Sequence, residues 1–434
     1  MPSRLSHAFR ALRHRNYRLF FSGQSVSLIG TWMQQLAMSW LVYRLTGSAF
    51  ILGVIAFATQ FPTFLLAPIA GVVADRRSRL GIVKMTQGSS MALVLLLAVL
   101  ILTDVVQVWH IVTIATLLGI VNGFDVPARQ SLLVQLVDGP EDLANAIALN
   151  SSMFNMARLV GPAVGGVLIG IVGEGLLFLV NGFTYIGVLS ALFAIRLEAP
   201  ARPSADARII ETLREGFEYA FGSPPIRAIL TLLALISLVG VPYVVLLPVF
   251  ASDVLGGGPS TLGILMSSAG FGALAGALYM ASRSTVRGLS RVIMYCTMVF
   301  SAGLVLFSLS RNLWLSSSLL FVTGFGVMVT TASINTILQT IVDEDKRGRI
   351  MSLYAMAFIG MAPIGSLFGG ALANRFGAPA TVLLGGFLCF LTAGWFARQR
   401  PAIRAAIRPI YARLGIIPEV ASGLQQATEL RPKA

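Results

Sequence analysis

Gly71-Val72-Val73-Ala74-Asp75-Arg76-Arg77-Ser78-Arg79 lies between two apolar runs, each as long as a membrane-spanning helix. Four charges fall within its last five residues, whereas the apolar runs 50–70 and 82–102 contain only Lys84. Because charges are costly in hydrocarbon, this stretch is predicted to emerge at a membrane face. Gly71 would allow two helices to approach closely and the chain to turn tightly.

The composition of the whole chain agrees with a polytopic membrane protein. The 434 residues are 56% hydrophobic and 12% charged, with a mean hydropathy of +0.81, whereas a soluble domain has about 25% charged residues. Cys296 and Cys389 both lie in apolar runs, and the three histidines are scattered. We therefore expect neither a disulfide framework nor a metal site.

Apolar runs of about twenty residues recur along the chain and predict an all-α membrane protein with twelve transmembrane helices. The predicted spans are 17–42, 50–72, 82–102, 109–133, 145–170, 175–195, 228–250, 261–281, 292–310, 314–338, 350–373 and 379–397.

The distribution of basic residues predicts the orientation of these spans. If the N-terminus is cytoplasmic, 28 of the 32 Lys and Arg fall in cytoplasmic segments or at their edges. This bias predicts that both termini are cytoplasmic. It also explains the net charge of +14, because the bases flank helices at an anionic leaflet and do not form a nucleic-acid-binding patch.

A polar stretch divides the chain into six spans and six. Residues 208–221 within it combine helical apolar spacing with alternating charge, which predicts an amphipathic helix on the cytoplasmic membrane surface. The predicted organisation is a basic N-terminus, a first six-helix bundle, a linker, a second bundle and a basic tail, over 1–16, 17–196, 197–227, 228–398 and 399–434.

The two halves match in parallel at an offset of about 205 residues, as estimated from aligned segments. Residues 135–150 align with 340–354, and 161–166 align with 365–370. A parallel six-span repeat predicts two bundles related about an axis along the membrane normal, with a cavity between them. Rocking of the bundles would expose this cavity to one side at a time.

The charged loop resembles the Gly-x-Leu-Ala-Asp-Arg-x-Gly-Arg-Arg motif of major facilitator superfamily transporters, with Val73, Ser78 and Leu80 as departures. Segments 12–20, 127–130, 145–151 and 347–354 resemble the branch that includes the bacterial enterobactin exporter and macrolide efflux pumps. The resemblance covers about 13–398 and implies secondary active efflux across the bacterial cytoplasmic (inner) membrane.

In similar proteins the charged loop is a conformational latch, and we transfer this expectation to Gly71, Asp75, Arg76 and Arg79. Asp75 would meet the start of span eleven, near 348–350. An arginine would meet an acid on span four, with Asp125 the first choice and Asp138 the second. Asp125 and Arg129 share a helix face, so they could instead form a local ion pair. Asp125 could also be a titrating group for coupling. An ordinary charged turn is the alternative for the whole loop.

Arg158 falls near the middle of span five, where an unpaired arginine costs about 3 kcal/mol or more. The repeat places Ala362 at the matching position. We therefore expect Arg158 to face the cavity and to contact substrate or contribute to coupling. The alternative is a hydrogen-bonded anchor with Asn155 or Asn122.

Other polar residues within spans are predicted to line the cavity or bridge helices, because lipid would leave them unpaired. The candidates for substrate or coupling roles are Gln34, Asn122, Asn150, Asn155, Tyr243, Asn335 and Gln339. Gly161-Pro162-x-x-Gly165-Gly166 resembles a signature of drug–proton antiporters, with close helix packing as the simpler interpretation.

No phosphate-binding loop or catalytic arrangement is apparent, so we expect neither ATP hydrolysis, an enzyme nor a cofactor. The predicted function is export of a small amphipathic compound, drug-like or siderophore-like, by proton-driven antiport. The predicted partners are that substrate, protons and membrane lipids, and the protein is expected to be monomeric. The alternatives are a major facilitator importer of a polar nutrient and a flippase for lipid or lysophospholipid.

Overall fold

The structure is a computed structural model that describes residues 9–197, 209–283 and 285–416. For Asp75 and residues 209–214 it describes the backbone alone. The described part is almost entirely helical, which confirms the predicted all-α class.

The first half begins with a short 3₁₀ helix and continues through five long helices. These are η1 (Arg10–Arg13), α2 (Arg15–Thr46), α3 (Ala49–Arg76), α4 (Arg79–Leu102), α5 (Val108–Leu133) and α6 (Pro140–Ala194). Gly173 interrupts α6 with a φ of 77°, a conformation that glycine adopts readily. Two membrane spans therefore lie within α6.

The linker forms α7 (Ile209–Gly222), close to the predicted 208–221. The second half contains α8 (Pro224–Leu235), η2 (Ile236–Gly240), α9 (Tyr243–Val249), η3 (Phe250–Val254), α10 (Pro259–Ala281), α11 (Leu289–Leu309), α12 (Leu313–Ile341), α13 (Glu344–Ala355), η4 (Met356–Gly360), α14 (Met361–Phe376) and α15 (Ala378–Arg413). Three π-helical turns, η2, η3 and η4, lie within its spans.

The number of spans agrees with the prediction of twelve. Within the described residues, ten helical segments are long and apolar enough to cross a membrane. One of these, α6, contains two spans. The remaining span is α2, which is 32 residues long and less apolar because it includes three glutamines.

The same helix pairs pack in both halves. In the first half α3 packs on α5 and α4 packs on α6. In the second half α10 packs on α12 and α11 packs on α15, at equivalent places in the order of spans. This repetition of packing is what a parallel duplication of six spans requires.

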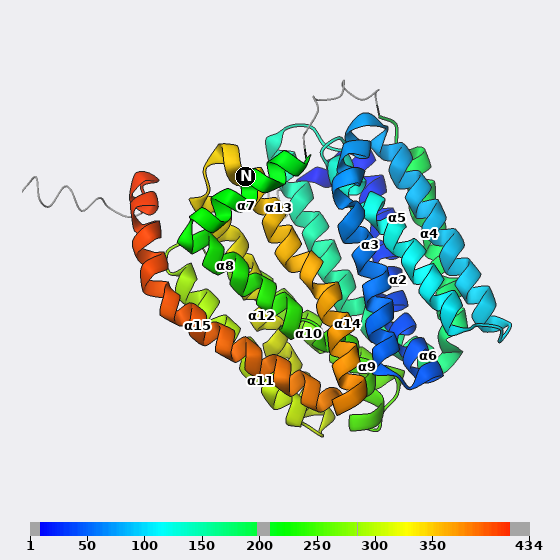
Figure 1. The fold of residues 1–434 in the computed structure, drawn as a ribbon. Coiled ribbons are helices and arrows are strands. Elements are labelled where there is room, and N and C mark those ends of the chain that lie inside the picture. Colours follow the sequence, from blue (N-terminus) through cyan, green and yellow to red (C-terminus); the bar gives the residue numbers. More distant parts are fainter. Residues whose placement is uncertain (1–8, 198–208, 284, 417–434) are drawn as a thin grey trace, which may run out of the picture.

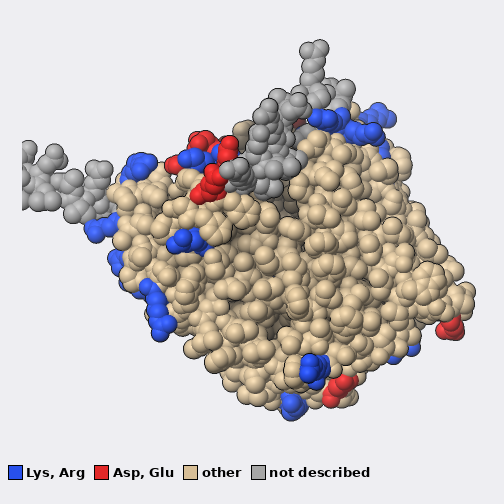
Figure 2. All heavy atoms as spheres, viewed as in Figure 1, with Lys and Arg blue, Asp and Glu red and all other residues tan. Residues whose placement is uncertain are grey.

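We call the face that carries η1, α7 and the end of α15 the terminal face, and the other end of the spans the opposite face (Figure 1). Figure 2 shows charged side chains gathered at these two ends and at one lateral edge, with a broad belt free of charge between them. Exposed apolar side chains populate the surface, among them Phe193, Ile171 and Trp314. This belt is the surface expected to face lipid.

The two halves are packed together mainly through α3 with α14 and α6 with α10. Smaller contacts join α9 to α2 and α3. On the terminal side, α8 and α13 pack within the second half and against α7. The halves therefore meet at mid-span and toward the opposite face.

The last helix is longer than its predicted span of 379–397. Helical structure continues without interruption to Arg413, and the buried Ile403 and Ile407 show that this extension packs on the protein. The expected tail from residue 399 thus begins as a continuation of α15.

Candidate functional site

Two glycine pairs join the halves, one in each of the major contacts. In α6, a Cβ added at Gly166 would lie 2.7 Å from the carbonyl oxygen of Pro259 and 3.0 Å from the Cα of Gly263. In α14, a Cβ at Gly370 would lie 3.0 Å from the Cα of Gly53. Backbones approach this closely only where side chains are absent.

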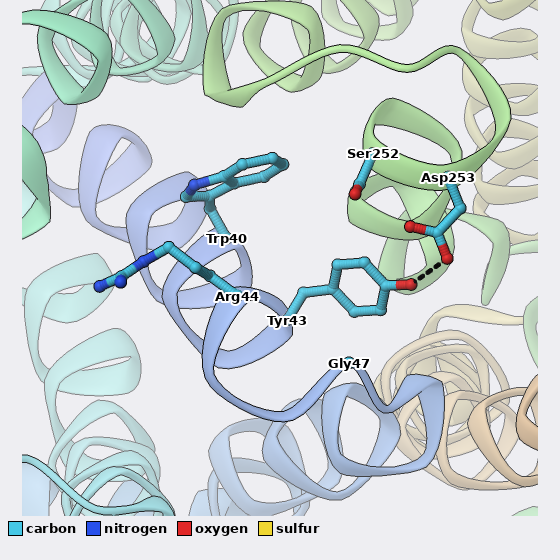
Figure 3. A pocket seen from close by; sticks show the side chains of 6 residues that line it. All are labelled: Trp40, Tyr43, Arg44, Gly47, Ser252 and Asp253. Carbon is cyan, nitrogen blue, oxygen red and sulfur yellow. Dashed lines mark hydrogen bonds between the residues drawn. The ribbon is translucent and has the colours of Figure 1, made fainter.

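Hydrogen bonds between the halves reinforce the closure of the opposite face. The Tyr43 hydroxyl donates to a carboxylate oxygen of Asp253, and these residues border a pocket of about 420 Å³ between the ends of α2 and η3 (Figure 3). The Ser260 hydroxyl donates to the Gly166 carbonyl at 3.1 Å. These contacts hold the two halves together at the opposite face.

An ion pair within the first half flanks this pocket. Arg44 Nε lies 2.8 Å from Glu174 Oε1. Figure 3 shows the Arg44 side chain directed away from Asp253, although both residues line the pocket. Among the described residues Asp253 is therefore hydrogen-bonded to the Tyr43 phenol, while Arg44 neutralises Glu174.

Arg158 lies on α6 where the halves meet, and its side chain is partly buried. Its guanidinium carbon is 5.9 Å from the centre of the Trp32 ring, and its charge acts on the phenol of Tyr243 from the second half. Among the described residues the guanidinium has no hydrogen bond or ion pair. The bond to Asn155 or Asn122 that the alternative interpretation requires is thus not formed in this conformation.

Aromatic side chains accompany Arg158. Trp32 and Phe154 pack edge to face with their ring centres 5.6 Å apart, and Phe154 is exposed. Tyr243, at the start of α9, is buried. A cation beside flat apolar rings can hold an anionic, amphipathic molecule.

The other predicted polar residues are dispersed. Gln34 is buried and accepts a hydrogen bond of 2.6 Å from Asn181, so it bridges two helices of the first half. The Asn155 amide donates to the Ser151 carbonyl of its own helix. Asn335 accepts a 2.6 Å bond from Gln339 one turn later in α12.

Two predicted asparagines remain partly exposed, namely Asn122 on α5 and Asn150 on α6. The structure thus places Arg158 and Tyr243 together and separates the remaining polar candidates over several helices. Asn181 was not among the predicted residues, although its position within an apolar run was a usable signal.

Asp125 is buried in the first half and fully engaged. Its Oδ1 accepts hydrogen bonds from Thr86 Oγ1 at 2.8 Å and Gln87 Nε2 at 2.9 Å. Its Oδ2 lies 3.2 Å from Arg129 Nε. The local ion pair is the arrangement present in this conformation, whereas Asp138, the second choice, lies 3.5 Å from His14.

The predicted latch lies on the terminal face, at the end of α3 and the start of α4. Arg79 donates to the Ser131 carbonyl at the end of α5. A Cβ at Gly71 would meet no atom within 4 Å, so the close approach expected there is absent in this conformation. The side chain of Asp75 lies outside the described residues, and Arg76 is exposed.

The start of span eleven instead contacts the linker helix α7. Arg349 Nη2 lies 2.7 Å from Glu215 Oε2, and Lys346 Nζ lies 4.6 Å from the centre of the Tyr219 ring. Tyr219 also donates to Asp343 at 3.3 Å. Burial raises the pKa of the Tyr219 phenol, and the nearby charge of Asp343 raises it further.

The glycine-rich segment of α6 faces two neighbours. A Cβ at Gly161 would lie 2.4 Å from the Cβ of Trp32, and one at Gly165 would lie 3.2 Å from the Cα of Met33, both on α2. Gly166 faces α10, as described above. Pro162 lies inside α6, between Gly161 and Gly165. The segment therefore binds α6 to its own half and to the other half.

Across the described residues, no group of three or more His, Cys, Asp or Glu is placed to hold a metal ion. The half–half contacts through Gly53 and Gly263 and the α7–α13 ion pair were not anticipated from the sequence, because each pairs residues from distant segments.

Comparison with known proteins places this architecture in a family. The sequence profile of the transmembrane secretion effector family matches residues 6–408. The staphyloferrin A transporter of Staphylococcus aureus is 25% identical, over 88% of this chain and 96% of that protein. Macrolide efflux protein A of Streptococcus pyogenes is 26% identical, over 87% of this chain and 95% of that protein.

Among solved structures, a bacterial homologue of the human lysosomal transporter Spinster, inward-facing and unoccupied, superposes with a TM-score of 0.65. The superposition covers 94% of this chain and 99% of that one at 15% identity, and it confirms the twelve-helix fold. Because the family profile matches almost the full length of the chain, the chain belongs to the transmembrane secretion effector family of the major facilitator superfamily.

Proposed function

We propose that this protein exports small amphipathic compounds by alternating access of a cavity between its two halves. The relatives that support this proposal include a staphyloferrin A transporter and a macrolide efflux protein. The observation that carries it is the unpaired Arg158 beside Trp32 and Tyr243 at the junction of the halves. A residue at this junction would become accessible from one side of the membrane and then from the other when the halves rock against one another.

The same arrangement supports a substrate with an acidic group. An arginine without a protein partner would bind a carboxylate or phosphate of the substrate strongly, because charge-assisted bonds are strengthened where water is scarce. Trp32 and Phe154 would bind the apolar part. Transport would then select amphipathic anions over compounds that are purely apolar.

Proton-driven antiport is the second part of the proposal. Asp125 is our candidate for the coupling group, because it is a carboxylate buried within a span and its ion pair with Arg129 lies near the terminal face. The positive-inside bias supports a cytoplasmic location for that face. The halves are closed at the opposite face, so this conformation would receive substrate from the cytoplasm.

A susceptibility and efflux panel would test the proposal. Cells that lack or overproduce the protein are compared for growth and for efflux of acidic and neutral amphipathic drugs, with and without an uncoupler. We expect overproduction to lower accumulation of acidic amphipathic compounds and the uncoupler to abolish the difference. Increased accumulation on overproduction would indicate import, and efflux that ignores the uncoupler would contradict proton antiport.

A further inference from the structure

A second pocket, separate from the half–half junction, lies on the terminal face of the second half. Its volume is about 550 Å³, and it is bordered by the α10–α11 turn, α12 and the extension of α15. Its lining includes five arginines and a tyrosine: Arg287, Arg291, Arg400, Arg404, Arg408 and Tyr411.

Among the described residues, acidic side chains do not neutralise this pocket. In the part of the chain that the structure describes, none of the five arginines has a carboxylate within 4 Å. Figure 2 shows basic side chains in succession at the edge where Figure 1 places α15, without acidic side chains among them. A concentration of arginines without acidic neighbours raises the local concentration of anions.

Local structure holds the two basic walls opposite each other. Arg400, Arg404 and Arg408 recur every four residues and so share one face of α15, while Ile403 and Ile407 are buried and fix this helix to the protein. In the facing wall, Gly288 has a φ of 77°, which turns the chain into α11.

That turn places the start of α11 at the pocket. Arg283 Nη2 donates to the Arg287 carbonyl at 2.9 Å and closes the loop. The first turn of α11 has no side-chain cap, and Gly288, Leu289 and Ser290 line the pocket. The N–H groups of Leu289 and Arg291 donate to the carbonyls of Val286 and Gly288, so the start of α11 adds the positive end of its helix dipole to the attraction for an anion that the arginines create.

The pocket lies where the apolar spans end. The apolar spans of α11 and α15 reach the terminal face at Leu289 and about Ala397, and the arginines follow directly. We propose that this pocket binds the phosphate headgroup of an anionic membrane phospholipid from the adjacent leaflet, because the arginines complement its charge and the belt beside them faces its acyl chains.

Lipid retention by the purified full-length protein tests this proposal. Parent and variants are reconstituted in nanodiscs with phosphatidylcholine and graded phosphatidylglycerol, and bound lipid is measured by native mass spectrometry. Two variants alter opposite walls, R404Q/R408Q on α15 and R287Q/R291Q on the turn. We expect each to bind phosphatidylglycerol about tenfold or more weakly than the parent, given the contribution of each basic residue near a membrane.

The matched control is R398Q/R413Q, which removes the same charge from exposed positions of α15 outside the pocket lining. It should bind phosphatidylglycerol as the parent does, and all variants should elute as monodisperse protein with parental thermal stability. An equal loss in the control would overturn the proposal in favour of general surface attraction. Competition by millimolar glycerol phosphate or inorganic phosphate that displaces the lipid completely would also overturn it, by assigning the pocket to a soluble phosphate.

Discussion

Arg158 and Asp125 are ionic residues within spans of the same half, and their surroundings differ. Asp125 is buried, with two hydrogen bonds and an ion pair. Arg158 has an aromatic ring and a phenol nearby but no described hydrogen bond or ion pair. A charge within a protein is stabilised only by its partners, so Arg158 is available to a ligand in this conformation, whereas Asp125 already has its partners.

Replacement of Arg158 by Ala should therefore abolish most transport without loss of stability. We expect at least a tenfold drop in efflux of acidic amphipathic compounds, and an unchanged or higher melting temperature, because the change removes an unpaired charge. Arg158→Lys should keep part of the activity, and Arg311→Ala at the opposite face serves as the control. A clear fall in melting temperature with intact efflux would show that Arg158 is a structural anchor.

Replacement of Asp125 by Asn should destabilise the first half. Loss of the carboxylate charge leaves Arg129 without its partner, at a cost of about 2 kcal/mol, which thermal unfolding in detergent can detect. Adding Arg129→Gln should cost little more, because both changes remove the same ion pair. Asp138→Asn is the matched control, since the Asp138 side chain is 98% exposed. Additive effects of the two changes would refute the coupling.

At the scale of elements, glycine pairs decide how closely helices of different halves approach. Gly166 meets Gly263 and Gly370 meets Gly53, and the first member of each pair belongs to a glycine-rich segment that recurs in the sequence repeat. The duplicated sequence therefore produces two equivalent crossings toward the opposite face. Any side chain inserted there must separate the halves.

Gly166→Ala should open the opposite face. Its methyl group would lie 2.7 Å from the Pro259 carbonyl oxygen, whereas Gly170→Ala, one turn later, would meet nothing closer than 3.6 Å. We expect a cysteine at Ser48, in a background without the two native cysteines, to react several-fold faster with an impermeant thiol reagent in Gly166→Ala. Equal rates in Gly166→Ala, Gly170→Ala and the parent would contradict this assignment.

The contact of α7 with α13 is another element-scale device. Arg349→Glu should release α7, since it replaces the ion pair with Glu215 by repulsion. The pair is partly exposed and worth less than about 1 kcal/mol, so amide hydrogen exchange over 215–222 should rise by no more than about fivefold. The charge-swapped double variant E215R/R349E should restore slow exchange, and Glu344→Arg should leave it unchanged. Failure of the swap to restore protection would exclude a role for the pair.

At the scale of the whole molecule, the two halves contact each other at mid-span and toward the opposite face. The arrangement of charge at the two ends of an apolar belt (Figure 2) fixes which surfaces face water. Because the basic residues concentrate on the terminal face, the membrane potential and anionic lipids favour a single insertion direction. Alternating access would then require the opposite-face contacts to break.

A topology map would test this orientation. Single cysteines at Arg77, Gly222 and Arg413 should react with impermeant reagent in inside-out vesicles and be protected in intact cells. Cysteines at Asp104 and Arg311 should show the reverse. The reversed pattern would place the terminal face outside, and a split between Arg77 and Arg413 would contradict the shared face.

The sequence determined the number and order of the spans, since each depends on a local run of apolar residues long enough to cross hydrocarbon. It also indicated the parallel repeat, through the match between the two halves, and the position of α7, through the apolar spacing of residues 208–221. The contacts of individual side chains could be assigned only from the tertiary structure. Gln34 was predicted to line the cavity or to bridge helices, and only the structure shows that its partner is Asn181, because the rotation of a helix about its own axis is set by its neighbours.

The closed face, the partners of Asp253 and Glu215, and the basic pocket along α15 were likewise decided by tertiary structure. Each joins residues from distant segments, and the one-dimensional pattern carries no information on which distant segments meet. Hydropathy places a residue within or outside the membrane, while the packing of helices decides what it touches there.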